Sequence, residues 1–167
     1  PVNMGDVIRR AIRMLQFHEH DRRILIPVKL APAEITLIGD ALHLEQLVFQ
    51  LLKNAIEACV DGQVQSPNIE ISCAYEDSNV VLKVQDNGPG LSEECETQIF
   101  EPFFSTKSYG LGMGLALSKR IAAAHHGSIR HTRCNISGVT TFSLHIPMTS
   151  LRPSQNILMP VLRQPGM

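Results

Sequence analysis

The sequence predicts an α+β fold in which one mixed β-sheet is covered by helices on one face. Segments with helical apolar spacing are separated by adjacent pairs of strand-like segments, whereas a parallel α/β sheet needs strict alternation of helix and strand. The composition also favours a packed core, because 44% of the residues are hydrophobic and 19% are charged. With 167 residues, one domain with its own core is expected.

The first elements are a helix and two short strands. Residues 6–17 place apolar side chains on one face at helical spacing. The apolar run 24–30 contains Pro27, which indicates an edge strand because proline has no N–H to give to a sheet. A second short strand is predicted at 35–38.

The longest predicted helix covers residues 40–61. Asp40 is a suitable N-cap, and apolar residues then recur every three or four positions. Two strands follow at 69–75 and 80–85, and the polar run between them predicts a hairpin.

The C-terminal half contains a short helix, a longer helix and two strands. Ser92 precedes a weak helix signal over 92–98, and a helix over 113–125 is expected to end at Gly127. The last two strands are predicted at 128–133 and 139–146.

The charge balance excludes several classes of partner. The chain has 15 Lys and Arg residues and 16 Asp and Glu residues, so its net charge is close to zero, and broad binding to nucleic acid or to an anionic membrane is not expected. No run approaches the ~18 apolar residues of a membrane-spanning helix. Cys59 and Cys73 fall in apolar patterns and are expected to be buried, and four free thiols indicate a reducing, cytoplasmic compartment. His125 and His126 are expected to be solvated at a helix end.

The domain is predicted to span residues 1–147. Residues 148–167 contain three prolines and no acidic residue, which indicates a tail or linker, although their apolar residues could instead dock on the domain or a partner. Because the chain begins at Pro1 rather than Met, we interpret it as an excerpt from a longer protein.

Two segments of the chain carry candidate ligand groups that can also be explained structurally. Gln50, Asn54, Glu57 and Asp61 form a polar stripe on the long helix, which could simply be its solvated face. Asn is a poor helix-interior residue, however, and its amide oxygen suits Mg²⁺. The run 86–90, DNGPG, follows a strand; it could be a plain turn, or its carboxylate could accept the exocyclic amine of adenine.

Two further segments precede the helix at 113–125. Residues 100–107 read FEPFFSTK and could form a structural plug or a hinge. Residues 110–115 read GLGMGL and lead directly into the helix, so backbone N–H groups and the helix N-terminus could together hold an anion.

Taken in order, these four motifs resemble the ATP-binding domain of the GHKL superfamily, which contains histidine kinases, gyrase B, Hsp90 and MutL. The resemblance covers about residues 20–147, and the run 100–107 is similar to the F box of nitrogen- and oxygen-sensing sensor kinases with a short lid. It implies a two-layer Bergerat-type sandwich with a mixed five-stranded sheet and about three helices.

The resemblance also implies roles for individual residues. Asn54 would hold Mg²⁺, Asp86 would bind adenine, and Thr141 would help to fix adenine through water. Catalytic roles fall to Asn54, Lys107 and Gln50. Residues expected to contact the nucleotide are Lys53, Asn54, Asp86, Gly88, Gly90, Phe100, Phe103, Thr106, Lys107, Gly110, Gly112, Gly114, Leu115 and Thr141.

Two positions depart from the family pattern. Gln50 stands where gyrase-type ATPases carry a general-base glutamate, and an amide cannot accept a proton from water, which favours phosphoryl transfer over hydrolysis. Glu57 stands where many kinases carry a lysine, so charge neutralisation would fall to Lys53, Lys107 and Mg²⁺.

The resemblance implies a catalytic domain of a two-component sensor histidine kinase that uses ATP and Mg²⁺. Its expected partners are a dimerisation domain bearing the phosphoacceptor histidine and a response regulator, since none of the seven histidines here has the sequence context of a phosphoacceptor. The segment between Thr106 and Gly110 is expected to move when no nucleotide is bound. A gyrase-, Hsp90- or MutL-type ATPase and a non-catalytic nucleotide sensor remain the alternatives.

Overall fold

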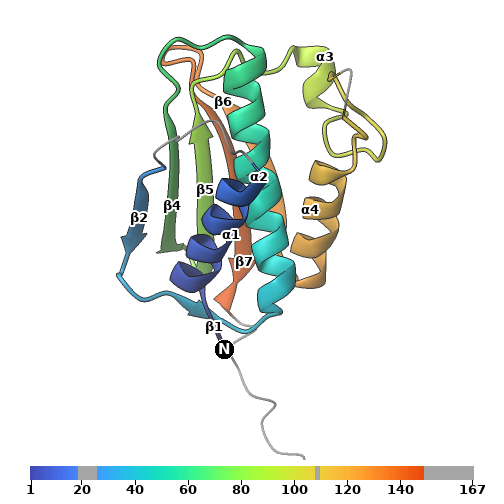
Figure 1. Cartoon of the computed structure of the whole chain (residues 1–167). Helices are drawn as coiled ribbons and strands as arrows, with labels where there is room; N and C mark the ends of the chain where they lie inside the picture. The colour runs from blue at the N-terminus through green and yellow to red at the C-terminus, as the bar shows by residue number, and fades with distance from the viewer. Residues whose placement is uncertain (19–25, 108–109, 149–167) are drawn as a thin grey trace, which may run out of the picture.

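A computed structural model describes residues 1–18, 26–107 and 110–148. Helices and strands follow one another in the order that Figure 1 shows. The helices are α1 (Met4–His18), α2 (Ala41–Asp61), α3 (Glu93–Glu96) and α4 (Gly114–Ala124). The strands are β1 (Val2–Asn3), β2 (Val28–Ala31), β3 (Thr36–Leu37), β4 (Ile69–Glu76), β5 (Asn79–Asp86), β6 (Ser128–Arg133) and β7 (Thr140–Pro147).

The main sheet has five strands in the order β2-β4-β5-β7-β6. Its β2–β4 pair is parallel and its other pairs are antiparallel, so the sheet is mixed. Helices α1, α2 and α4 lie side by side over one face of it (Figure 1). The predicted fold class is therefore confirmed, with a fourth helix, α3, that is a single turn of four residues.

Strand β2 is at the edge of the sheet, as Pro27 predicts. The strand itself begins at Val28, and the carbonyl oxygen of Pro27 accepts a hydrogen bond from the N–H of Ile71. Residues 24 and 25 of the predicted strand lie outside the described residues.

A second, two-stranded sheet is formed by β1 and β3. The strand predicted at 35–38 is present as Thr36–Leu37, but it pairs with Val2–Asn3 rather than joining the main sheet. A strand of two residues is too short to show a recognisable alternation of apolar and polar residues, so the sequence does not predict β1.

Helix α2 is the centre of the helical layer, because it packs between α1 and α4 and against β5. Its buried face carries Leu44, Leu47, Val48, Leu51, Leu52, Ala55, Ile56 and Cys59. Burial of this stripe follows from its spacing of three and four residues, which keeps every member on one side of the helix.

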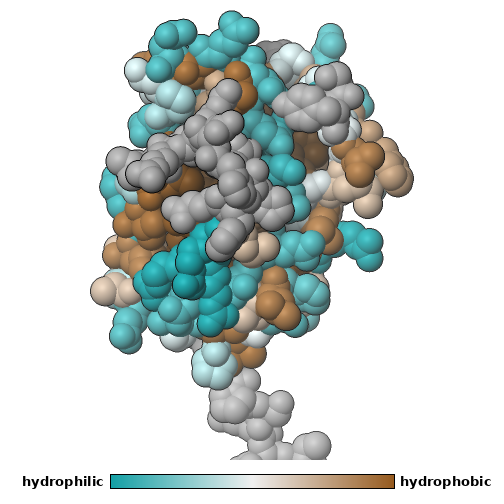
Figure 2. Space-filling model, viewed as in Figure 1, coloured by the Kyte–Doolittle hydropathy of each residue, from teal (hydrophilic) through white to brown (hydrophobic). Residues whose placement is uncertain are grey.

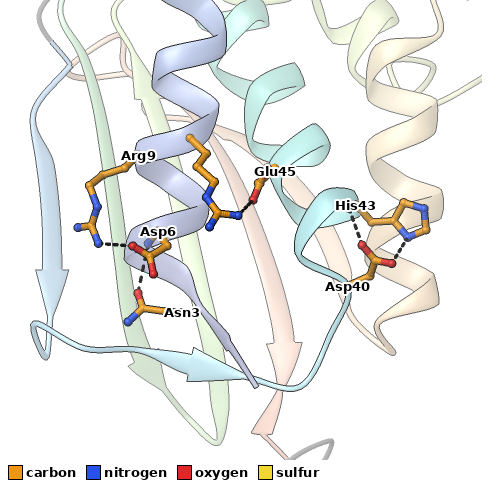
Figure 3. A network of polar contacts seen from close by, with 7 residues as sticks. Asn3, Asp6, Arg9, Asp40, His43 and Glu45 are labelled. Carbon is orange, nitrogen blue, oxygen red and sulfur yellow. Dashed lines mark hydrogen bonds and ion pairs between the residues drawn. The ribbon is translucent and has the colours of Figure 1, made fainter.

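Polar contacts fix the N-terminal ends of α1 and α2 (Figure 3). The carboxylate of Asp40 accepts a hydrogen bond from the N–H of His43 at 3.0 Å, so Asp40 is the N-cap that the sequence predicts. Asn3 caps α1 in the same way, through the N–H of Asp6 at 3.2 Å. Arg10 of α1 binds the buried carboxylate of Glu45 in α2 at 2.9 Å, which ties the two helices together.

The hairpin between β4 and β5 is also confirmed. Asp77 and Ser78 connect the strands with φ angles of 43° and 63°. Two successive positive φ angles are typical of the turns that match the twist of a two-residue hairpin.

His125, predicted to be solvated, is in fact buried, with 7% of its surface exposed. Its Nδ1 donates to the carbonyl oxygen of Ile121 at 2.8 Å, so Nε2 is left to accept the N–H of Asp40 at 3.0 Å. The imidazole thus links the end of α4 to the start of α2. The chain turns away from the helix at His126, whose φ is 56°. Gly127 then allows the chain to lie close to β7, because a Cβ on Gly127 would be 2.3 Å from the carbonyl oxygen of His145.

Within residues 1–18, 26–107 and 110–148, no helix is long and apolar enough to cross a membrane. Cys59 and Cys73 are buried as predicted, and all four cysteines are free thiols.

Candidate functional site

A cavity of about 390 Å³ lies between the second half of α2 and the chain that leads into α4. The described residues that line it come from α2, from Leu91 and Ile99, and from the segments 104–107 and 110–115. Among the residues predicted for catalysis or nucleotide binding, it brings together Gln50, Lys53, Asn54, Thr106, Lys107, Gly110, Gly112, Gly114 and Leu115.

The polar stripe of α2 faces this cavity. Gln50, Lys53, Asn54 and Glu57 all line it, on the side of the helix away from its apolar stripe. Asp61, the last member of the stripe, is exposed and is not among the lining residues. The stripe from Gln50 to Glu57 is therefore the wall of a site rather than a solvated face.

Lys107 reaches into the cavity and meets two oxygens of α2. Its ammonium group contacts a carboxylate oxygen of Glu57 and lies 3.4 Å from the side-chain oxygen of Asn54. Lys53 lies 3.7 Å from the other oxygen of Glu57. The hydroxyl of Ser105 accepts the N–H of Lys107 at 3.1 Å, which fixes the backbone from which this side chain extends.

The glycine segment is shaped by close contacts. Gly112 has a φ of 67°, and a Cβ there would lie 2.5 Å from backbone atoms of Phe103 and Phe104. A Cβ on Gly114, the first residue of α4, would lie 2.6 Å from the side-chain oxygen of Gln50. Since no side chain caps α4, its first N–H groups are available at the positive end of the helix dipole, beside the cavity.

Asp86 lies at the end of β5 and is 2% exposed. Its carboxylate accepts the N–H of Gly88 at 2.9 Å. Burial raises the pKa of Asp86, while this hydrogen bond and the nearby Arg133 act in the opposite direction. The result is a buried acceptor whose geometry is fixed by its own turn.

The turn after Asp86 is held from three sides. The side chain of Asn87 accepts the N–H of Asn68 at 2.8 Å and donates to the carbonyl oxygen of Ser66 at 2.9 Å. Arg133 lies over Gly90, where a Cβ would be 1.7 Å from its guanidinium. The run 86–90 is thus a turn with a fixed shape and a buried carboxylate.

The structure does not place Thr141 with Asp86, and that assignment is corrected. Thr141 lies on the other face of the sheet, where its hydroxyl accepts a hydrogen bond from Gln85 at 3.2 Å. Thr140 is the register partner of Asp86, is buried, and accepts a hydrogen bond from Arg133 at 3.1 Å. The alternation of side chains along β7 is the signal that identifies Thr140.

The phenylalanines of the run 100–107 have three different positions. Phe100 packs edge-on against Phe142, with ring centroids 6.4 Å apart, and so acts as a plug. Phe103 has a φ of 67° and is 78% exposed, and only Phe104 lines the cavity. Phe100 and Phe103, like Asp86, Gly88 and Gly90, are not among the residues that line this cavity, so their contacts with a nucleotide stay predictions. Figure 2 shows apolar atoms at the right edge, over the segment joining α3 to α4, where Phe103, Leu111 and Met113 are exposed.

Some features of the site were not predicted from the sequence. The sequence does not single out Arg133, Thr140 or Phe104, and it does not indicate that Glu57 pairs with Lys107. Residues 108 and 109, within the segment expected to move, lie outside the described residues. Among the described residues, no group of three or more His, Cys, Asp and Glu could hold a metal ion.

Comparisons with known proteins agree with this geometry. The chain is 34% identical to the C4-dicarboxylate transport sensor protein DctB of Rhizobium meliloti over 87% of its length, and 35% identical to DctS of Rhodobacter capsulatus over 88%. It spans only 23% and 22% of those two proteins.

Among solved structures, the catalytic domain of the histidine kinase ThkA superposes with a TM-score of 0.75 at 25% identity. That match covers 88% of this chain and 93% of the ThkA domain. A buried carboxylate at a strand end, an amide-bearing helix and a glycine segment opening a helix are arranged here on the fold of a histidine kinase catalytic domain. Residues 39–150 match the family profile, and the chain belongs to the histidine kinase-, DNA gyrase B-, and HSP90-like ATPase family.

Proposed function

We propose that the chain binds ATP with Mg²⁺ and donates the γ-phosphoryl group to a histidine on a separate dimerisation domain. The observation that carries the proposal is the cavity in which Lys53 and Asn54 of α2 face Lys107 and the glycines that open α4. The similarity to sensor proteins and to a histidine kinase catalytic domain supports this function over other uses of a nucleotide.

Asp86 would select adenine. A carboxylate accepts hydrogen bonds only, so it matches the exocyclic amine of adenine and repels the carbonyl oxygen that guanine carries at that position. The N–H of Gly88 holds one carboxylate oxygen, which leaves the other available to the base. The space beside Gly90 is taken by the guanidinium of Arg133, so Arg133 would have to move for a base to approach the backbone there.

The glycine segment and the lysines would bind the phosphates. The backbone at Gly110, Gly112 and Gly114 and the first turn of α4 at Leu115 offer N–H groups at the edge of the cavity. Lys53, Thr106 and Lys107 add side-chain contacts in the same cavity. These groups neutralise charge on the polyphosphate, which is the main requirement of phosphoryl transfer.

Asn54 would hold Mg²⁺. The residues fit a cation, because the Lys107 ammonium already lies against the side-chain oxygens of Asn54 and Glu57. Bound Mg²⁺ would neutralise the phosphate oxygens and orient the terminal phosphoryl group.

Gln50 favours transfer over hydrolysis. Its side chain lines the cavity beside Gly114 but cannot take a proton from an attacking water. The acceptor would therefore be supplied by a partner, namely the dimerisation domain, and the phosphoryl group would pass on to a response regulator in the cytoplasm.

Transfer of labelled phosphate tests the proposal. The chain is incubated with γ-labelled ATP, Mg²⁺ and the histidine-bearing domain of its parent protein or of a close relative. We expect acid-labile label on the acceptor histidine, and we expect Asn54→Ala to reduce the rate at least about tenfold because the metal is no longer held. Glu76→Gln, which removes a carboxylate from an ion pair with Lys83 outside the cavity, is the control.

Two results would contradict this function. Hydrolysis of ATP by the chain alone, at a rate well above the protein-free background, would favour an ATPase of the gyrase type. Tight ATP binding without transfer to any offered histidine would favour a nucleotide sensor.

A further inference from the structure

The ammonium group of Lys107 lies at the point where two oxygens of α2 converge. One is the side-chain oxygen of Asn54, at 3.4 Å, and the other belongs to the carboxylate of Glu57. Asn54 and Glu57 are three residues apart on the helix and so project from the same face. A cation thus already bridges the two residues, although Lys107 is 50 positions from Glu57 in the sequence.

An amide oxygen and a carboxylate are also the ligands that suit Mg²⁺. This ion is usually held by one or two carboxylates together with substrate phosphates and water. The described part of the chain offers no group of three or more acidic, histidine or cysteine side chains, so phosphate oxygens and water would have to complete the coordination. An ammonium group and Mg²⁺ cannot both occupy the position between these two oxygens.

The geometry points to Glu57 as a second protein ligand of Mg²⁺ beside Asn54, with Lys107 holding both oxygens until the metal replaces it. This inference rests on the proposed function, since the metal would arrive with the nucleotide. Once displaced, the ammonium group of Lys107 would still be within the cavity that Thr106 and the glycine segment also line, where the phosphates would bind.

The charges explain why such an exchange is useful. Without a cation, the carboxylate of Glu57 would repel the polyphosphate of a nucleotide in the same cavity. The side chains of Glu57 and Lys107 are 22% and 20% exposed, so each needs a partner, yet both remain accessible for exchange. Glu57 therefore makes the site prefer a nucleotide that brings its own metal.

Lys53 does not replace Lys107 in this arrangement. Its ammonium group lies 3.7 Å from the other oxygen of Glu57, and 46% of its side chain is exposed. It can stay beside Glu57 while the oxygen that faces Asn54 passes from Lys107 to the metal.

The test measures the affinity for a non-hydrolysable ATP analogue by calorimetry, once with Mg²⁺ and once with EDTA. We expect Glu57→Gln to weaken binding at least about tenfold in Mg²⁺, because a ligand of the ion is lost. In EDTA the same variant should bind as tightly as the wild type or more tightly, because a negative charge has been removed from beside the phosphates. Glu76→Gln, in the ion pair with Lys83 on the hairpin, should change neither value.

Lys107→Gln provides the second arm. This substitution removes the ammonium group that competes with the metal, and it also removes a phosphate contact. Because the competition is gone, the ratio of the dissociation constant in EDTA to the dissociation constant in Mg²⁺ should rise above that of the wild type. Thermal unfolding of each variant checks that the fold is retained.

Three outcomes separate the possibilities. If Glu57→Gln binds in Mg²⁺ as tightly as the wild type, or loses affinity equally in both buffers, Glu57 is no metal ligand and its pair with Lys107 only supports the fold. An unchanged ratio in Lys107→Gln likewise overturns the exchange. If the wild type binds no nucleotide in either buffer, the proposed function itself fails, and this inference fails with it.

Discussion

At the scale of single residues, Asp86 shows how the fold maintains a functional group at a cost in stability. Its carboxylate is buried, which raises its pKa, so the folded chain binds a proton at this site more tightly than the unfolded chain does. Ionised Asp86 consequently lowers the stability of the fold as the pH rises through its pKa, and protonation restores it. The proposed contact with adenine would account for a carboxyl group at such a buried position.

Gly112 and Gly138 form a natural matched pair, since their φ angles are 67° and 69°. A Cβ on Gly112 would lie 2.5 Å from the backbone of Phe103 and Phe104, whereas a Cβ on Gly138 would lie 3.9 Å from the guanidinium of Arg133. We expect Gly138→Ala to cost about 1 kcal/mol of stability through backbone strain, with nucleotide affinity unchanged.

Gly112→Ala adds a steric clash to the same strain, so the segment beside the cavity must shift. We expect a clear loss of affinity for the ATP analogue, measured by calorimetry, in a protein that still unfolds cooperatively. Equal affinities in the two variants would show that the shape of this segment does not matter for binding.

Some residues of the cavity can be located from the local sequence alone. Asn54 was singled out because an amide is unusual inside a helix, and it lines the cavity. The sequence could not choose between the adjacent Thr140 and Thr141, because only the strand register decides which of them shares a face with Asp86. The burial of His125 depends on the N–H of Asp40, 85 positions away, which no local pattern reveals.

At the scale of elements, the fold depends on α2 having two different faces. Its apolar stripe fills the core, while Gln50, Lys53, Asn54 and Glu57 form the wall of the cavity. Two contacts fix the N-terminal part of the helix. Asp40 caps the first turn, and Arg10 of α1 reaches the buried carboxylate of Glu45 one turn later.

His125 connects α4 to this arrangement, because its imidazole accepts the N–H of Asp40 and donates to Ile121. We expect His125→Leu to lower the stability by about 1–3 kcal/mol, since the N–H of Asp40 loses its partner in a partly buried position. Chemical denaturation measures this loss. The control is His126→Asn, at the exposed neighbour whose positive φ asparagine tolerates. Equal stability of His125→Leu and the wild type would contradict the role of this link.

Most elements could be predicted because their periodicity spans several turns or alternations. Helix α2, the hairpin of β4 and β5, and the last two strands are present close to their predicted bounds. The pairing of β1 with β3 and the parallel pairing of β2 with β4 could not be predicted, because both join segments that are distant in the sequence.

At the scale of the whole molecule, a nearly neutral chain can still bind an anionic ligand. The net charge is −1, but the cavity gathers Lys53, Lys107 and the N-terminus of α4 around one carboxylate, Glu57. Local arrangement rather than total charge therefore decides what the site accepts. Asn54 of α2 lines this cavity, whereas Asp86 at the end of β5 is not among its lining residues. The proposed nucleotide would therefore have to reach from the helical layer to the sheet.

The most direct test of the account is the affinity of the 167-residue chain and of Asp86→Asn for a non-hydrolysable ATP analogue with Mg²⁺, by calorimetry. We predict one binding site per wild-type chain. Asp86→Asn should bind at least about tenfold more weakly, because a charge-assisted hydrogen bond is lost. The variant should be at least as stable as the wild type at neutral pH, because a buried charge has been removed. Equal affinity in a folded Asp86→Asn protein, or no binding by the folded wild type, would contradict the account.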